Sequence, residues 1–171
     1  TISSVTWVSG SAAAINTNDA SLLTSELSAM FPDGAARDFI GTSGTAASLV
    51  WRIDGLDDGM TYSFDILSSR TGTGNRNSLF IMQGANTVQG EINAAGNSQL
   101  LSIDGVVPNS GSILLTLRAG TGNTGFTYFN SFEMTAVPVP EPASLGLLAL
   151  GGVIVLRRRS RCQTHRVRTA S

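Results

Sequence analysis

Residues 49–67 read LVWRIDGLDDGMTYSFDIL, two apolar runs joined by a turn rich in Asp and Gly. In both runs the large apolar residues fall at every second position, namely Leu49, Trp51 and Ile53, then Tyr62, Phe64 and Ile66. Alternation at period two is typical of β-strands that bury one face. The stretch therefore predicts two strands, with Trp51 in the core between Leu49 and Ile53.

The same pattern recurs along most of the chain. Further runs of strand-forming residues, separated by turns that contain Gly, Asn or Pro, cover 3–8, 78–83, 87–92, 99–103, 112–117 and 127–134. Together with the first two they make about eight short strands, at turn spacings of about ten residues, which indicates an antiparallel sandwich of the jelly-roll kind. The fold class predicted for residues 1–136 is therefore mainly β.

One short helix is expected near the N-terminus. Asn18 or Asp19 can cap it, and Pro32 and Gly34 can end it. Its apolar stripe has helical spacing and consists of Leu23, Leu27, Met30 and Phe31.

The turn at 55–62, GLDDGMTY, resembles the corner of fibronectin-type sandwiches. In that corner a tyrosine hydroxyl returns to backbone a few residues upstream and locks the entry to a strand. The resemblance implies a structural role for Tyr62. Segment 55–76, which includes Arg70 and Arg76, also looks like a sandwich module of exported environmental bacterial proteins, a loose likeness that implies no function.

Charge divides the chain into two parts. Residues 1–136 carry five arginines against eleven acids, and residues 137–171 carry six arginines against Glu141 alone. An acidic domain without lysine, with its arginines scattered, lacks the electrostatic footprint of a nucleic-acid-binding protein. We therefore expect no nucleic-acid partner.

Cys162 is the only cysteine and His165 the only histidine, and both follow residue 161. Residues 1–136 therefore cannot hold a Ser-His-Asp triad, a cysteine nucleophile, a structural zinc of thiolates and imidazoles, or an intrachain disulfide. This absence favours a protein that is not an enzyme.

Residues 137–161 read VPVPEPASLGLLALGGVIVLRRRSR, a proline-rich segment followed by an apolar run and a basic cluster. The apolar run 143–156 is fourteen residues long, short of the roughly 20 that cross a bilayer, and it has no polar face. We expect a hydrophobic helix outside the core, ended by Arg157, Arg158, Arg159 and Arg161. Because arginines tend to stay cytoplasmic, residues 1–136 are expected on the other side of the membrane.

The succession of Pro140, Glu141, Pro142, apolar run and arginines closely resembles the PEP-CTERM sorting tail of exported proteins of Gram-negative bacteria. The resemblance implies that an exosortase-type membrane protease recognises the Pro-Glu-Pro motif, cuts nearby, and releases or transfers a protein anchored transiently in the inner membrane. It also implies a signal peptide before Thr1. Residues 162–171 extend past the arginines, where such tails usually stop, and are expected to be a disordered tail.

Three groups of residues are candidates for further chemistry. Asp54, Asp57 and Asp58 invite a calcium site, but Leu56 stands where an EF-hand loop beginning at Asp54 needs an oxygen ligand, which favours a turn without a metal. A glycan hydrolase could use a pair of carboxylates without histidine. The acids in predicted strands are Asp65, Glu91 and Glu133.

Sugar binding is the other possibility, because exposed aromatic rings make flat platforms for pyranose rings. The better candidates are Trp7 and Tyr128, since the adjacent Tyr128 and Phe129 are expected to face opposite sides. Arg70 and Arg76 could hold an acidic polysaccharide, or could pair with Asp57 or Asp65.

These patterns predict an exported structural or adhesive protein of the cell envelope or extracellular matrix. The alternatives are a carbohydrate-binding module for exopolysaccharide and, third, a small glycan-active enzyme.

Overall fold

The computed structural model describes residues 2–10, 12, 14–16, 25–32, 38–70, 74–95 and 99–139. The chain divides into two compact units, Thr1–Pro138, called the body below, and Val139–Ser171. The predicted hydrophobic helix at 143–156, the sorting motif, the arginine cluster and the tail 162–171 lie outside the described residues.

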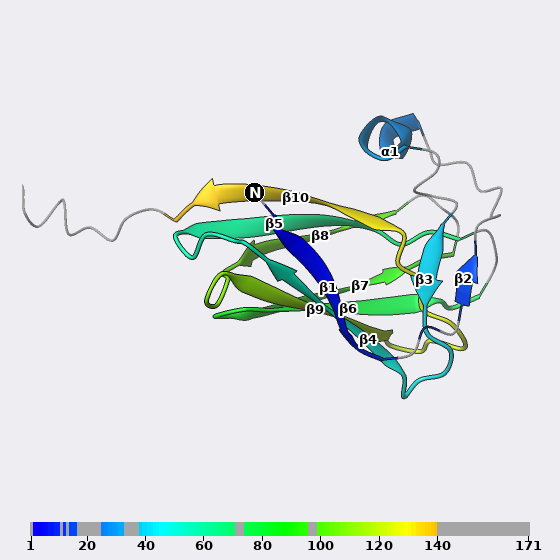
Figure 1. The fold of residues 1–171 in the computed structure, drawn as a ribbon. Coiled ribbons are helices and arrows are strands. Elements are labelled where there is room, and N and C mark those ends of the chain that lie inside the picture. Colours follow the sequence, from blue (N-terminus) through cyan, green and yellow to red (C-terminus); the bar gives the residue numbers. More distant parts are fainter. Residues whose placement is uncertain are drawn as a thin grey trace, which may run out of the picture. The chain divides into compact units, whose positions relative to one another are not determined.

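The body is a mainly β, antiparallel sandwich, which confirms the predicted fold class (Figure 1). One sheet has five strands, in the order β1 (Ser4–Ser9), β4 (Ser48–Asp54), β9 (Ser112–Ala119), β6 (Asn77–Gln83) and β7 (Thr87–Asn93). The facing sheet has three, in the order β10 (Ser131–Pro138), β5 (Met60–Leu67) and β8 (Leu100–Val106). A small pair, β2 (Ala14–Asn16) and β3 (Phe39–Gly41), and the helix α1 (Ser25–Met30) complete the described elements.

Alternation along the strands builds the core between the two sheets. In β4 the side chains of Leu49, Trp51 and Ile53 are buried, whereas Arg52 between them is exposed. The facing strand β5 buries Tyr62, Phe64 and Ile66 in the same way. The core cluster also holds buried residues of the other strands and turns: Leu56, Phe80, Met82, Ile92, Ile103, Val106, Ile113, Leu115 and Leu117.

The turn between β4 and β5 has the predicted tyrosine corner. Tyr62 is 4% exposed, and its hydroxyl accepts a hydrogen bond of 2.8 Å from the backbone N–H of Asp57. The Asp57 carboxylate accepts a second bond from the N–H of Gly59, also at 2.8 Å. The corner thus joins the turn to the core residue that starts the buried face of β5.

Helix α1 packs against the outer face of the three-stranded sheet. Leu27 and Phe31 form a second apolar cluster with Leu67, against which Leu100 packs, and Leu67 and Leu100 are register partners of β5 and β8. The expected helix is therefore present, but Met30 of its apolar stripe is 43% exposed. The expected cap residues, Asn18 and Asp19, and Leu23 and Gly34 lie outside the described residues.

Strands β2 and β3 were not predicted, because three residues are too few to show a period of two. The last strand also differs: β10 begins at Ser131, not at residue 127. Residues 127–130 instead contact the β3 region, through a bridge between Ile40 and Phe129 and through the buried pair Thr42 and Thr127, whose hydroxyl oxygens lie 2.9 Å apart.

Candidate functional site

Strand β1 carries the most exposed apolar surface of the five-stranded sheet. Val5, Trp7 and Val8 are 50%, 41% and 51% exposed. The register pairs Val5 with Ile53 and Trp7 with Trp51, so Val5 and Trp7 share the face that is buried on β4. β1 therefore extends the core face of the sheet beyond the part that is covered.

Trp7 rests on a ring that is itself fixed in the core. The centroids of Trp7 and Trp51 lie 5.5 Å apart at an interplanar angle of 80°, and Trp51 contacts Phe129 at 5.4 Å. Trp51 is 8% exposed, as its alternation with Leu49 and Ile53 predicts. Edge-to-face packing of this kind favours a defined ring position. Trp7 is thus an exposed aromatic ring on a rigid support.

The prediction that Tyr128 offers an exposed ring is wrong, since its side chain is 0% exposed. Tyr128 lies in a third apolar cluster with Phe39 and Ala94, and its ring meets that of Phe39 edge to face at 4.8 Å. Phe129 is half-buried against the main core. The two rings pack into different apolar clusters, so both sides of this segment are covered and neither ring is exposed as predicted.

Arg70 is held by the same aromatic cluster. Its guanidinium carbon lies 5.1 Å from the ring centroid of Tyr128 and 5.8 Å from that of Phe39, and a terminal N–H donates to the Tyr128 hydroxyl. Cation–π contacts and this hydrogen bond fix the half-buried side chain. Phe39 was not among the predicted site residues, because nothing in sequence connects it with Arg70.

Arg76 lies at the same end of the sandwich as Arg70. The backbone N–H of Arg70 donates to the Ala94 carbonyl at 2.9 Å, and the N–H of Ala94 donates to the Arg76 carbonyl at 3.3 Å. The Arg76 guanidinium lies so close to Gly125 that a Cβ there would meet it at 1.7 Å. Pairing of these arginines with Asp57 or Asp65 is not found: the ion pair of the described residues joins Arg52 and Asp54, at 2.9 Å.

The three candidate hydrolytic acids are divided between two outer faces of the sandwich. Asp65 and Glu133 are register partners on the outer face of the three-stranded sheet, and Asp65 accepts a hydrogen bond from Ser102. Glu91 lies on the outer face of the five-stranded sheet, where it accepts two bonds of 3.0 Å from the backbone and hydroxyl of Thr121. Glu91 therefore cannot share a cleft with Asp65 or Glu133.

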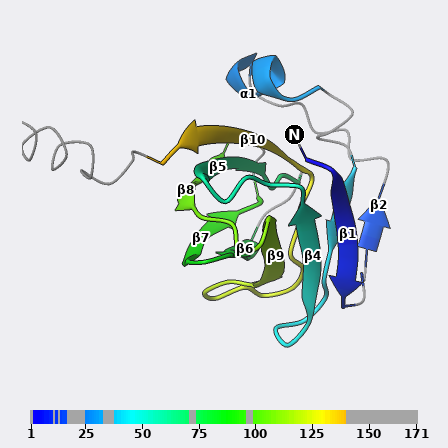
Figure 2. The same cartoon turned by 60° about the vertical axis from the view of Figure 1, so that its left-hand side comes forward.

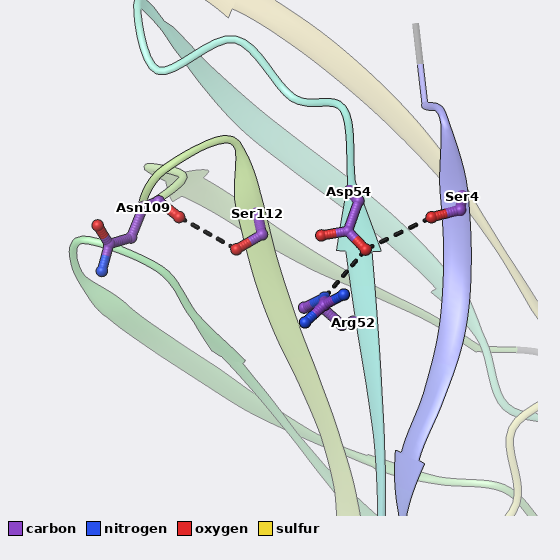
Figure 3. Close-up of polar contacts among 5 residues, drawn as sticks. All are labelled: Ser4, Arg52, Asp54, Asn109 and Ser112. Atoms are coloured by element: carbon purple, nitrogen blue, oxygen red, sulfur yellow. Dashed lines mark hydrogen bonds and ion pairs between the residues drawn. The ribbon is translucent and has the colours of Figure 1, made fainter.

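The acids considered for calcium have partners within the protein. Figure 3 shows the Asp54 carboxylate accepting from Arg52 at 2.9 Å and from Ser4 at 3.4 Å. Nearby in the same view, the Ser112 hydroxyl donates to the Asn109 carbonyl at 3.1 Å. Asp58 accepts from the N–H of Gly111 at 2.9 Å. Within the described part of the chain, no cluster of three or more His, Cys, Asp or Glu side chains could hold a metal ion.

The end of the body leads directly into the predicted sorting motif. The final register pair of β10 and β5 joins Pro138 to Met60, and Val137 and Val139 are 54% and 40% exposed. Among the helices in the described residues, none has the length and apolarity needed to span a membrane.

Three solved structures of carbohydrate-binding modules are similar to this chain, and no curated protein matches it. Xyl-CBM35, in complex with a disaccharide that contains glucuronic acid, is 19% identical, with 82% of this chain and 96% of that chain covered and a TM-score of 0.47. TmCBM61, in complex with β-1,4-galactotriose, is 16% identical over 79% and 90%, with a TM-score of 0.46. The CBM35 of Abf62 from Cellvibrio japonicus is 18% identical over 80% and 99%, with a TM-score of 0.42. Likeness at these values carries no argument about what this chain binds.

The family comparison concerns the C-terminal segment. Residues 138–161 match the PEP-CTERM protein-sorting motif, which includes the Pro-Glu-Pro triplet, the apolar run and the arginine cluster. The match confirms the resemblance drawn from the sequence. This chain therefore carries a PEP-CTERM sorting motif and is an exported protein with a C-terminal sorting signal.

Proposed function

We propose that this protein is a structural or adhesive component of the cell envelope or extracellular matrix, processed at its C-terminus by an exosortase-type membrane protease. The match of residues 138–161 to the sorting motif carries the proposal. Pro140, Glu141 and Pro142 are the recognised triplet. The arginines after the apolar run hold the C-terminus on the cytoplasmic side, because positive charge resists translocation.

The position of the motif suits removal after folding. β10 pairs with β5 through Pro138, and the triplet begins at Pro140. A cut within or after the triplet therefore leaves every strand of the sandwich in place. The fourteen-residue apolar run, shorter than a standard span of about 20, suits a transient anchor better than a permanent one.

Mass spectrometry of the protein recovered from the native host's surface tests the processing step. The mature form should lack Arg157, Arg158, Arg159 and Arg161, and replacing Pro140, Glu141 and Pro142 by alanine should leave them attached. Glu133→Ala, an exposed change on β10, serves as the control and should be processed normally. A mature wild-type form that retains the arginines refutes the proposal.

Carbohydrate binding by the body is the second candidate, and the observation that favours it is the exposed ring of Trp7 on its support, Trp51. An apolar ring of fixed orientation can stack on the C–H face of a pyranose. Arg70 rests on Phe39 and Tyr128, Arg76 lies beside Gly125, and Trp7 rests on Trp51, so either arginine would hold an acidic sugar as a subsite separate from Trp7.

A glycan array probed with the purified protein tests this candidate. Trp7→Ala should abolish binding, whereas Val137→Ala, which removes exposed apolar surface on β10, should leave it unchanged. Binding that survives Trp7→Ala assigns the glycan to another surface and refutes the role of Trp7.

A further inference from the structure

Strand β1 is an edge strand that lacks the charged side chains and proline which commonly block pairing. Figure 2 shows β1 next to β4 at the end of the sheet, and among the described residues no strand pairs with the other edge of β1. Its six residues, SVTWVS, include no charge, proline or glycine, and all six are exposed. The unpaired N–H and C=O groups of an edge strand can pair with another strand. Charged side chains or proline on the edge commonly prevent such pairing.

We propose that this edge pairs with the same edge of a second copy, so that two β1 strands lie antiparallel and the two five-stranded sheets become continuous. This proposal is independent of the sorting tail. Two copies of one strand in an antiparallel pair are related by a two-fold axis perpendicular to the sheet. Such a contact is closed, because each subunit presents the same patch to the other.

The two faces of β1 and the positions of its apolar side chains determine the register that we propose. Val5 and Trp7 share the face of Ile53 and Trp51, whereas Ser4 and Thr6 lie on the opposite face with Asp54 and Arg52. Residues directly opposite in an antiparallel pair must lie on the same face. A two-fold axis at any residue of β1 meets this condition, and only the axis at Thr6 also pairs the two exposed apolar side chains Val5 and Trp7 with each other. It places Thr6 opposite the partner's Thr6 and Val5 opposite the partner's Trp7, twice over.

This register favours a second copy over other occupants. Each Val5 lies opposite the Trp7 ring of the other copy, and a β-branched residue opposite an aromatic ring is a stabilising cross-strand pair. The contact also covers both side chains, which are exposed in the single copy. No like charges face each other across the seam, although the body as a whole is acidic. The nearest charges on β4, Arg52 and Asp54, already form an ion pair. The register shift between Trp7 and Ser9 bends β1 only beyond the central residues.

Sedimentation equilibrium of the full chain tests the proposal. We expect a concentration-dependent dimer, and Thr6→Lys should raise its dissociation constant at least about tenfold by placing two ammonium groups together on the axis. Thr135→Lys makes the same change at an exposed position of another edge strand, β10, and should have no effect. A protein that is monomeric at all concentrations overturns the proposal. A dimer that neither substitution weakens also overturns it, and would indicate association through the apolar tail.

Cross-linking provides a second test that does not depend on how Thr6→Lys folds. In the full chain carrying Cys162→Ser, Thr6→Cys places two thiols opposite each other within the Cα separation that a disulfide spans. Mild oxidation should give a disulfide-linked dimer, and Thr135→Cys should stay monomeric. Equal yields from the two variants, or none from Thr6→Cys, contradict pairing about Thr6.

The same variants separate dimer formation from glycan binding. Trp7 takes part in both, whereas Thr6 points to the opposite face. If Trp7 binds a glycan, Thr6→Lys should weaken the dimer and leave Trp7 available to the glycan, so failure of one proposal does not entail failure of the other.

Discussion

Single side chains hold the turns of this sandwich in place. Tyr62 does so from the core, through its hydroxyl bond to Asp57, and Glu91 does so from the surface, through its two bonds to Thr121. Both residues were considered from sequence, Tyr62 as a corner and Glu91 as a potential catalytic acid. The corner was predictable because all its parts lie within eight residues. The role of Glu91 could not be predicted, because its hydrogen-bond partner Thr121 lies thirty residues away in the sequence.

Loss of the Tyr62 hydroxyl should weaken the body. Tyr62→Phe leaves the part-buried N–H of Asp57 without its partner, so we expect a destabilisation of about 1–3 kcal/mol by chemical denaturation. Ser112→Ala, which removes an exposed hydroxyl bond to Asn109, should stay within about 0.5 kcal/mol of wild type. Equal losses in the two variants would mean that the corner bond adds nothing beyond an ordinary surface contact.

The pairing of neighbouring elements determines which side chains lie together on the outer face of the three-stranded sheet. The three-stranded sheet carries α1 over Leu67 and Leu100, and next to this it places Asp65 opposite Glu133. Directly opposed like charges destabilise a sheet. The acids could be assigned to strands from sequence, but their opposition depends on the register of β10, which begins four residues later than predicted.

Reversing one of these charges should stabilise the body. Glu133→Arg places a guanidinium opposite Asp65, and we expect a gain of about 0.2–1 kcal/mol in the free energy of unfolding that shrinks with added salt. Thr135→Arg lies opposite Ser63 and should bring no comparable gain. A salt-independent effect, or the same effect at both positions, would argue against a charge interaction.

The contact between β3 and residues 127–130 should tolerate no added volume. A Cβ at Gly41 would lie 1.9 Å from the Thr127 carbonyl oxygen, a backbone atom, so Gly41→Ala should destabilise the body by about 1–3 kcal/mol. At Gly59 the nearest atom is a carboxylate oxygen of Asp57 at 3.2 Å, and Gly59→Ala should cost less. Thermal unfolding of the two variants measures the difference; a Gly41→Ala protein as stable as wild type would contradict the close approach.

At the scale of the whole molecule, the body and the C-terminal segment have separate tasks. The body is acidic and closes its own core, and the segment from Val139 onward contains the sorting signal. β10 is the last strand before the motif and contributes Phe132 and Met134, which pack against the core. The length of chain that folds should therefore end between β10 and the triplet.

Truncation measures this boundary. A chain that ends at Pro138 should unfold cooperatively at the same temperature as the body within the full chain, because its contacts are internal. A chain that ends at residue 130 lacks β10 and should not fold, since Phe64 loses its ring contact with Phe132 and β5 loses a ladder. Circular dichroism during heating distinguishes the two; cooperative unfolding of the shorter chain would show that β10 is dispensable.

The sequence by itself determined the sandwich class, the strands with clear alternation, the tyrosine corner and the sorting motif. Each of these is encoded within a short window, through periodicity, turn residues or a linear motif. Only the tertiary structure decided that Tyr128 is buried, that Arg70 rests on Phe39 and Tyr128, and that Val5 and Trp7 remain exposed on an edge. The exposure of each of these residues depends on which segments, distant in the sequence, pack over it. Local periodicity contains no information about such long-range contacts.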